Sequence, residues 1–228
     1  MIPDLQPSKI REMHGLAGPD SVNLGLGQPV LDQPSEFINV VNQVMREDDL
    51  GYTGYAGLPE LREAVANRVC GKSGSGDNVS ITVGTTEGLF ATLLTLLQQD
   101  DEVLIPDPGF VLYSAVIKIV GGQPVTYPLY ASNDFDLSVD DITERITSRT
   151  RAILINSPNN PTGRIIDRSQ LEQLTEIAAA HDLYVISDEV YDTIDYTGNF
   201  SSAWGLTDKV IVLGGASKTF AMTGWRLG

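Results

Sequence analysis

The sequence contains little that would support a disulfide, a metal site or a membrane anchor. Its 228 residues include one cysteine, Cys70, and two histidines, so no intramolecular disulfide can form. No run approaches the roughly 18 apolar residues of a membrane span, and the first residues lack the basic and apolar regions of a signal peptide. We therefore expect a cytoplasmic protein with no metal and no membrane partner, in which Cys70 is a small packing residue.

Basic residues are also scarce. The chain has 15 Lys and Arg against 30 Asp and Glu, which gives a formal net charge of −15. Because nucleic acids are bound mainly through cationic contacts to phosphate, this balance argues against a nucleic-acid partner. The hydrophobic fraction of 42% is typical of a globular protein, and the length suffices for one sizeable core or for one domain and part of another.

From residue 79 onward, short runs rich in β-forming residues alternate with helix-length segments. The predicted strands are residues 79–83, 102–105, 124–127, 152–155, 183–186 and 210–213. The predicted helices between them are residues 86–98, 110–120, 138–147, 169–181 and 201–206. Strands that are separated by helical connections predict an α/β fold, with a mostly parallel sheet and helices on both faces.

The first third of the chain shows a weaker pattern. Residues 1–20 are polar and turn-rich, and residues 22–29 indicate a short strand that runs into a loop. Ser35 is expected to cap a helix over residues 37–45, because its hydroxyl can accept from a free N–H of the first turn. Pro59 is a typical first residue for a second helix.

Glycine-rich and amide-containing motifs follow two of the predicted strands. In a parallel sheet, ligands collect at the carboxyl ends of the strands. The first motif is Gly84-Thr85-Thr86, a turn that opens a helix and whose free N–H groups suit a phosphate. The second is Asn156-Ser157-Pro158-Asn159-Asn160-Pro161, in which two prolines would hold an asparagine amide in one orientation. An ordinary helix start and a tight turn are the alternative interpretations.

Two further predicted strands are followed by reactive groups: a carboxylate and a phenol follow one, and a lysine follows the other. Asp188 follows residues 183–186, with Tyr191 three positions later, so both can face one ligand. Lys218 follows residues 210–213, and lysine is the side chain that proteins use for Schiff bases. The alternatives are a helix cap and a solvated loop lysine. Together the four motifs match pyridoxal 5′-phosphate, which needs an amine, an acid beside its ring nitrogen, donors to its ring oxygen and a phosphate nest.

The chain resembles the class I/II aminotransferases, which are fold type I pyridoxal-phosphate enzymes, and within them the aspartate/aromatic aminotransferase subgroup. The motifs that carry the resemblance lie at residues 52–62, 107–110, 159–163, 187–191 and 217–226. The resemblance begins near residue 20 and continues to the last residue. It implies an arm and the start of a small domain over residues 1–30, a cofactor-binding large domain over residues 31–228, incomplete at its carboxyl end, and no carboxyl-terminal small domain.

The resemblance also implies roles for individual residues. Lys218 would form the Schiff base with the cofactor and, once displaced by the substrate amine, carry the proton between Cα and C4′. Asp188 would keep the ring nitrogen protonated, and Tyr191 and Asn160 would hydrogen-bond the ring oxygen. The remaining implied contacts are the phosphate ligands Arg226, Thr85, Thr86 and Ser217, the ring-stacking Phe110, and the substrate-binding residues Gly27 and Asn160.

The implied reaction is the ping-pong transfer of an amino group between an amino acid and a 2-oxo acid. Tyr52 matches a tyrosine that in this family reaches the cofactor phosphate of the neighbouring subunit, which implies a homodimer with shared sites. A pyridoxal-phosphate-dependent lyase or synthase on the same scaffold is one alternative. A truncated, non-catalytic protein that binds the cofactor or a partner is another.

Members of the resembled family continue well beyond the length of this chain. Their later part supplies the arginine that binds the substrate α-carboxylate. We therefore expect the sequence to be a fragment of a longer protein, with a naturally truncated paralogue as the alternative.

Overall fold

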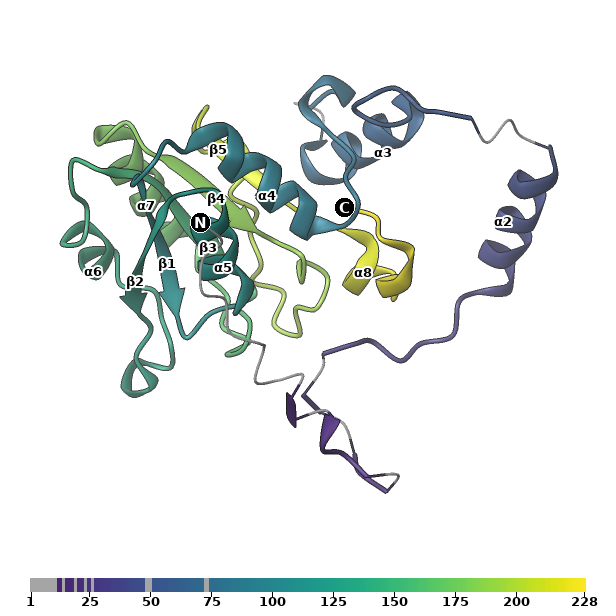
Figure 1. The fold of residues 1–228 in the computed structure, drawn as a ribbon, viewed down its shortest axis with the longest axis horizontal. Helices are drawn as coiled ribbons and strands as arrows, with labels where there is room; N and C mark the ends of the chain where they lie inside the picture. Colours follow the sequence, from purple (N-terminus) through teal and green to yellow (C-terminus); the bar gives the residue numbers. More distant parts are fainter. Residues whose placement is uncertain are drawn as a thin grey trace.

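The computed structural model describes residues 12–13, 15–18, 20–22, 24–25, 27–47, 51–71 and 74–228. Its helices and strands, in chain order, are α2 (Ser35–Glu47), α3 (Pro59–Val69), α4 (Thr85–Leu96), β1 (Glu102–Asp107), α5 (Leu112–Ile119), β2 (Gln123–Pro128), α6 (Val139–Thr143), β3 (Thr150–Asn156), α7 (Arg168–Ala180), β4 (Tyr184–Asp188), β5 (Val210–Leu213) and α8 (Ala216–Thr219). Figure 1 shows the sheet at one end of the molecule, α2 at the other, and α8 between them.

The five strands form one parallel sheet in the order β2-β1-β3-β4-β5. Asn156 at the end of β3 lies beside Asp188 at the end of β4, and Asp188 lies beside Leu213 at the end of β5. The carboxyl ends of three neighbouring strands are therefore aligned. Side chains that leave these ends converge on one edge of the sheet.

Helices cover both faces of the sheet, as the alternation of strands and helices predicts. Along β3, Ile153 and Ile155 point into a core that includes residues of α6 and α7, whereas Ala152 and Leu154 point into a second core with α4 and α5. All four side chains are fully buried. Because alternate residues face opposite cores, the middle of the strand, residues 152–155, is continuously apolar, which is typical of a strand covered on both faces.

The predicted strands at 102–105, 124–127, 152–155, 183–186 and 210–213 correspond to β1 to β5. The helices predicted at 86–98, 110–120 and 169–181 correspond to α4, α5 and α7, and the helix that Pro59 was expected to start is α3. The α/β fold with a parallel sheet is confirmed. Cys70 is buried at the end of α3, where burial raises the pKa of its thiol.

The predicted strand at 79–83 is wrong. Thr82 exchanges two backbone hydrogen bonds with Gly228, of 2.8 and 3.0 Å, and the Ile81 N–H donates to the carbonyl of Ala56. These contacts connect the segment to two different parts of the chain. No ladder of consecutive partners forms, so the apolar run adopts an extended conformation without strand pairing.

The helix expected at 201–206 is also absent: residues 201–203 have no regular structure, and residues 204–206 form a turn and a bend. Here the Ala203 N–H donates to the Glu189 carboxylate at 2.9 Å and the Trp204 N–H donates to the Ser202 hydroxyl at 3.1 Å. Side-chain acceptors thus occupy the backbone donors that a helix would use. The helix predicted at 138–147 shortens to α6, because Thr147 turns toward β3.

The amino-terminal predictions are tested only in part. Ser35 does not cap α2: it is the first residue of that helix, and its hydroxyl donates to Glu36. Residues 22, 24, 25 and 27–29 form no strand, and residues 23 and 26 lie outside the described part of the chain. No helix within the described ranges is both long and apolar enough to cross a membrane.

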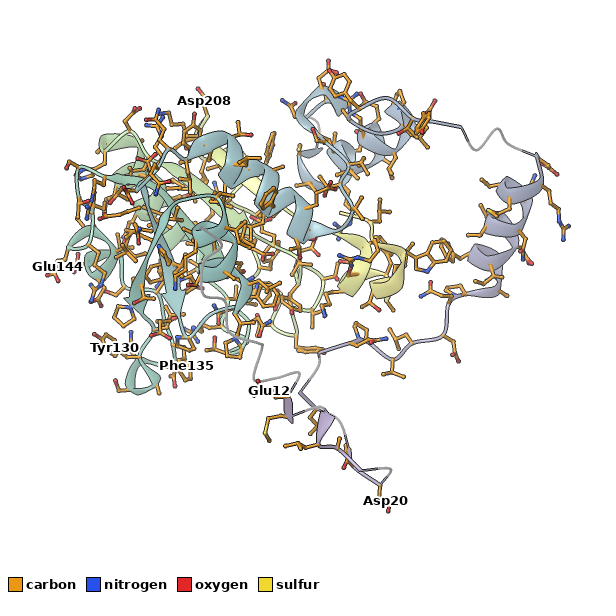
Figure 2. The ribbon with its side chains drawn as sticks, in the orientation of Figure 1. Glu12, Asp20, Tyr130, Phe135, Glu144 and Asp208 are labelled. Atoms are coloured by element: carbon orange, nitrogen blue, oxygen red, sulfur yellow. The ribbon has the colours of Figure 1, made fainter. Side chains whose placement is uncertain are left out.

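Exposed carboxylates account for much of the negative charge around the sheet. Glu144 and Asp208 project from its periphery in Figure 2, and both are exposed. Asp182 likewise lies at the surface and pairs with Lys209. These groups are hydrated, so they stabilise the fold little and place no buried charge in it.

Candidate cofactor site at the carboxyl end of the sheet

Asp188 is the last residue of β4 and is 7% exposed. Its carboxylate accepts the Tyr113 hydroxyl at 2.7 Å and the Val190 backbone N–H at 3.2 Å. Burial raises the pKa of Asp188, and these two neutral donors oppose the rise. Within the described residues no cation pairs with this carboxylate, so it can accept a positively charged group.

Tyr113 was not identified from the sequence. It lies on α5, is 1% exposed, and contacts Phe110 edge to face, with ring centroids 5.5 Å apart. Burial, followed by the charge of Asp188, raises its pKa well above the ordinary value, so the phenol is a donor at neutral pH. The apolar pattern of α5 marked this position only as core, and no motif linked it to Asp188.

The structure brings Asn160 and Tyr191 together. The Asn160 amide donates to the Tyr191 hydroxyl at 3.3 Å. Burial and then the charge of Asp188 raise the pKa of Tyr191, while the hydrogen bond with Asn160 lowers it. The pair places an amide and a phenol next to the end of β4.

Asn156 holds this arrangement in place and was not singled out from the sequence. Its amide donates to the Asp188 carbonyl at 2.9 Å, and its side-chain oxygen accepts the Asn160 N–H at 2.7 Å. The side chain therefore connects the loop after β3 to the end of β4. The sequence placed Asn156 at the start of the motif over residues 156–161 but gave it no role of its own.

Lys218 lies on α8, the short helix that follows β5. Its Nζ donates to the carbonyl of Gly27 and lies 5.7 Å from the centroid of the Tyr191 ring. Burial lowers the pKa of the amine. Lys218, Gly27 and Tyr191 thus lie together, although Gly27 and Lys218 are separated by most of the length of the chain.

The amino end of α4 and Arg226 form the other side of this region. Arg226 donates to the carbonyls of Thr223 and Val83, and its guanidinium occupies the space where a side chain on Gly84 would be. Gly84 has a φ of +79°, so a glycine is required there for both reasons. Arg226 forms no ion pair with a described carboxylate and remains available to an anion.

Thr85 and Thr86 begin α4, and their backbone N–H groups have no partner within the described chain. The Thr85 hydroxyl donates to the carbonyl of Gly214 at 2.8 Å, which ties α4 to the turn before α8. The Ala216 N–H donates to the carbonyl of Leu227 at 3.0 Å and so holds the chain next to Arg226. Free N–H groups at a helix start, beside an unpaired guanidinium, suit a phosphate.

The remaining predicted site residues differ in position. Phe110 is half-buried beside Tyr113, and Ser217 precedes Lys218 on α8. Tyr52 is fully exposed, with a relative accessibility of 109%, and makes no hydrogen bond within the described chain. The structure therefore does not bring Tyr52 to the other residues of this site.

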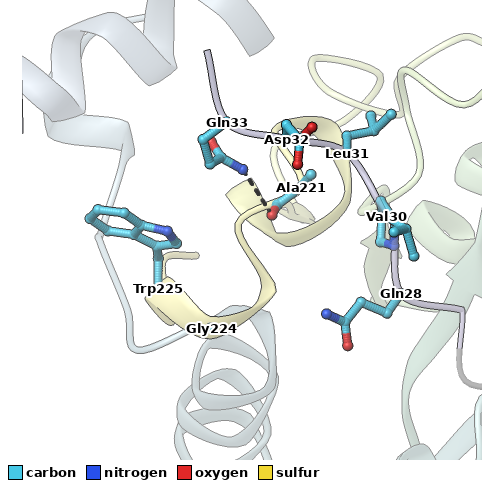
Figure 3. A pocket seen from close by; sticks show the side chains of 9 residues that line it. Gln28, Val30, Leu31, Asp32, Gln33, Ala221, Gly224 and Trp225 are labelled. Atoms are coloured by element: carbon cyan, nitrogen blue, oxygen red, sulfur yellow. Dashed lines mark hydrogen bonds between the residues drawn. The ribbon is translucent and has the colours of Figure 1, made fainter. Parts of the chain in front are cut away.

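An open groove of about 500 Å³ lies beside α8, between residues 28–33 and the residues that follow α8 (Figure 3). Gln33 crosses it and donates to the carbonyls of Phe220 and Ala221 at 3.2 and 3.1 Å. Trp225 forms one wall and contacts Phe37 of α2 edge to face. The groove is adjacent to the segment that carries Lys218.

The donor set fits pyridoxal 5′-phosphate. Lys218 offers an amine with a lowered pKa, and Asp188 is a buried carboxylate without a cation. The free N–H groups of α4 and the unpaired Arg226 offer a place for a phosphate. The described residues contain no group of three or more potential metal ligands.

Comparison with known proteins identifies the family to which the chain belongs. The family model of the class I and II aminotransferases matches residues 19–228. The chain is 38% identical to a probable aspartate aminotransferase of Methanocaldococcus jannaschii over 99% of this chain and 60% of that protein. It is 41% identical to an aromatic-amino-acid aminotransferase of Thermococcus litoralis over 98% of this chain and 60% of that protein. The chain thus spans about 60% of the length of these curated relatives.

Solved structures show the same relationship. The chain superposes on aspartate aminotransferase from Thermus thermophilus with maleate with a TM-score of 0.91 and 33% identity, over 98% of this chain and 61% of that one. On aspartate aminotransferase from Thermotoga maritima the TM-score is 0.92 with 35% identity, over 100% and 63%. The enzymes of this family use pyridoxal 5′-phosphate. The chain belongs to the class I and II aminotransferases, in the subgroup of the aspartate and aromatic aminotransferases.

Proposed function

We propose that this chain forms the cofactor-binding domain of a pyridoxal-phosphate-dependent aminotransferase, which moves an amino group between an amino acid and a 2-oxo acid. The observation that carries the proposal is the convergence of Lys218, Asp188 and the pair of Asn160 and Tyr191 at one edge of the sheet. Pyridoxal 5′-phosphate supplies an aldehyde that exchanges amines and a ring that accepts electrons.

Lys218 is the amine that binds the cofactor and moves the proton at the substrate Cα. Its pKa is lowered by burial, so more of the amine is neutral and nucleophilic at a given pH. The Gly27 carbonyl accepts from Nζ and holds it at this edge of the sheet. An amine that accepts a proton from the substrate Cα can return it to C4′ of the cofactor, which is the proton transfer that transamination requires.

Asp188 holds a proton on the ring nitrogen. Its carboxylate is bonded by neutral donors only, so its negative charge remains uncompensated within the described chain. In a site sheltered from water, attraction between this charge and a protonated nitrogen is less screened than in solvent. A protonated ring nitrogen makes the ring a better electron acceptor.

Asn160 and Tyr191 donate hydrogen bonds to the ring oxygen, and Phe110 packs against the ring. The Asn160 amide and the Tyr191 hydroxyl already contact one another at 3.3 Å, which fixes both donors before the cofactor arrives. Asn156 in turn fixes Asn160 through its backbone N–H. Donors that are held in position lose little conformational entropy on binding.

The phosphate is held by Thr85, Thr86, Ser217 and Arg226. Two free backbone N–H groups and the dipole of α4 attract an anion, and Arg226 adds a full positive charge beside Gly84. Ser217 lies one residue before Lys218, so the phosphate contacts and the reactive amine are held by the same short helix.

The relatives' names point to aspartate and aromatic amino acids as substrates. We assign the substrate side of the site to Gly27 and Asn160, which lie next to Lys218 and Tyr191. The 1–30 segment belongs to the arm and to the start of a small domain in this assignment, and residues 31–228 form the large domain.

A half-reaction tests the proposed function in the whole enzyme of which this chain is proposed to form the cofactor-binding domain. The purified protein, loaded with the cofactor and freed of excess, is given aspartate or phenylalanine without any 2-oxo acid acceptor. Transamination releases no more than one equivalent of 2-oxo acid per site, and release resumes when an acceptor such as 2-oxoglutarate is added. A lyase would instead release carbon dioxide or ammonia continuously without an acceptor, and it would form no 2-oxo acid from these two substrates. No release by the wild type would contradict the proposal, and Lys218→Ala is the inactive control.

We further propose a homodimer in which Tyr52 of one subunit reaches the phosphate of the other. The full exposure of Tyr52 on a glycine-rich loop supports this, since the residue has no partner in its own described chain. In mixtures of Tyr52→Ala with Lys218→Ala, a hybrid dimer holds one site with both residues intact. In an equal mixture that reassociates at random, about half of the dimers are hybrids, so about a quarter of all sites are expected to regain normal cofactor affinity. No gain over the separate variants would rule out a shared site.

A further inference from the structure

A buried hydrogen bond joins Tyr113 of helix α5 to Asp188 at the cofactor edge of the sheet. The phenol donates to Oδ2 of Asp188 at 2.7 Å, and both residues are less than 10% exposed. No other side chain in the described residues bonds the Asp188 carboxylate. Nothing in the family motifs of the sequence pointed to this helix residue.

We propose that Tyr113 is a positioning residue, which keeps the Asp188 carboxylate ionised and fixed in orientation toward the ring nitrogen. This rests on the proposed function, because it gives Asp188 the ring nitrogen as its partner. An ionised carboxylate has about four lone-pair positions, and Tyr113 and Val190 occupy two of them. The remaining positions are available to a cationic donor, with the side chain already held in place.

The physical reason lies in the burial of Asp188. A carboxylate without water binds a proton instead of staying charged, unless donors stabilise its ionised form. A phenol that donates to a carboxylate forms a charge-assisted hydrogen bond, which is shorter and stronger than a neutral one. The Tyr113 contact is of this kind, and the Val190 N–H at 3.2 Å is longer.

The groups around the pair leave Tyr113 as the dominant partner. The other titratable groups that influence the pair are Tyr191, from the segment after β4, and Tyr127, from β2. Both are phenols and uncharged at neutral pH. From β3, Asn156 contacts only the backbone carbonyl of Asp188. No described cation stands close enough to form an ion pair with the carboxylate.

The chain offers a matched control in Tyr127. Like Tyr113, it is a tyrosine that is 1% exposed, and its hydroxyl donates a single hydrogen bond, at 3.0 Å. Its acceptor is the backbone carbonyl of Leu154, which does not titrate. Tyr113→Phe and Tyr127→Phe therefore remove the same atom from equally buried sites, and only the first change affects a carboxylate.

The sign of the pH effect follows from the raised pKa of Asp188. An acid whose pKa is higher in the folded chain than in the unfolded chain lowers the stability as pH rises between the two values. Tyr113→Phe raises the folded value further. The extra loss therefore develops as pH rises above the wild-type pKa of Asp188, and it is complete above the pKa of the variant.

The experiment measures the unfolding equilibrium of the cofactor-free chain in denaturant over a pH series from mildly acidic to about pH 8. For Tyr113→Phe, the increase in the unfolding constant relative to wild type is expected to be about tenfold larger at the alkaline end than at the acidic end. For Tyr127→Phe the increase is expected to stay the same across the series. A pH-independent cost for both variants would overturn the proposal. If Tyr113→Phe does not fold at the alkaline end but folds at the acidic end, that result supports it.

A second readout uses pyridoxal 5′-phosphate itself. Tyr113→Phe is expected to raise its dissociation constant about tenfold and to shift the pH dependence of the bound cofactor's absorption, whereas Tyr127→Phe leaves both unchanged. If the wild type binds no cofactor while the unfolding result holds, the proposed function fails and the carboxylate pair stands. If the wild type binds it and Tyr113→Phe binds equally well with an unshifted spectrum, the positioning role is wrong.

Discussion

Buried carboxylates lie at both ends of the sheet, and two of them, Glu102 and Asp188, have opposite environments. Glu102, at the amino end of β1, is 4% exposed and accepts from Thr147, Arg149 and Thr150. Hydrogen bonds from Thr147 and then from Arg149 outweigh burial and lower its pKa. Asp188, at the carboxyl end of β4, is 7% exposed, but its donors are neutral and its pKa is raised.

This difference indicates that the charge of Glu102 is structural, whereas the charge of Asp188 is available for function. Glu102 is compensated by a cation of its own chain and connects the segment before β3 to β1. Asp188 has no such cation among the described residues, although a buried charge without one is costly. Such a cost is typical of a functional site, where a ligand supplies the missing partner. In the proposed function that partner is the protonated ring nitrogen.

The largest expected effect concerns the reaction. Asp188→Asn is expected to lower kcat of the transaminating enzyme by roughly 10³-fold, about 4 kcal/mol in the barrier, because the ring nitrogen loses its anionic partner. Glu102→Gln removes an equally buried charge at the other end of the sheet and is expected to leave kcat within about threefold. Steady-state kinetics on both variants checks this. Similar losses in the two would erase the contrast.

The second effect concerns stability at the amino end of the sheet. Glu102→Gln is expected to reduce the free energy of unfolding by about 1–2 kcal/mol near neutral pH, since the bonds from Thr147 and Arg149 lose their charged acceptor. The estimate is kept small because Arg149 is 65% exposed and well hydrated when released.

The pH dependence gives this prediction a sign. The folded pKa of Glu102 is lowered, so its contribution is present above the unfolded value of about 4.3 and is lost as pH falls through the folded value. Denaturant titrations of the wild type and of Glu102→Gln should therefore converge at acidic pH. A stability difference that persists unchanged there would show that Glu102 acts through packing and not through its charge.

The smallest effect has the opposite sign. In the cofactor-free chain, Asp188→Asn is expected to raise the free energy of unfolding by about 1 kcal/mol near pH 8, because a neutral amide replaces a buried charge without a cation. The gain should shrink as pH falls and wild-type Asp188 becomes protonated. Urea titrations of the two proteins measure it. If Asp188→Asn is destabilised at pH 8, the charge of Asp188 stabilises the fold as that of Glu102 does, and the contrast between the two carboxylates is wrong.

The sequence predicted the strands correctly where an apolar run pairs with a neighbouring strand of the sheet. β5 has the bounds that the run at 210–213 predicts, because all of its pairing is with β4. The run at 79–83 is likewise rich in β-branched residues, but its backbone bonds to Ala56 and Gly228, which are distant in sequence. A local pattern contains no information on such partners, so the strand prediction failed there.

The site was predictable where motifs carry chemistry. The positions of Lys218, Asn160 and Tyr191 were expected, and the structure brings them to one edge. Tyr113 and Asn156 were missed, since a tyrosine on an apolar helix and an asparagine at a strand end have many structural explanations. Their importance depends on which residue they contact across the sheet, and only the fold determines that.

The central claim is that Lys218 is the amine that binds pyridoxal 5′-phosphate. The protein is incubated with the cofactor, reduced with borohydride, digested and mapped by mass spectrometry. The account predicts one phosphopyridoxyl group, on Lys218. The Lys218→Ala variant, in which Asp188 and Arg226 are unchanged, is expected to carry no such group. A label on Lys118 or Lys209, or an unlabelled Lys218 in a protein that holds the cofactor, would contradict it.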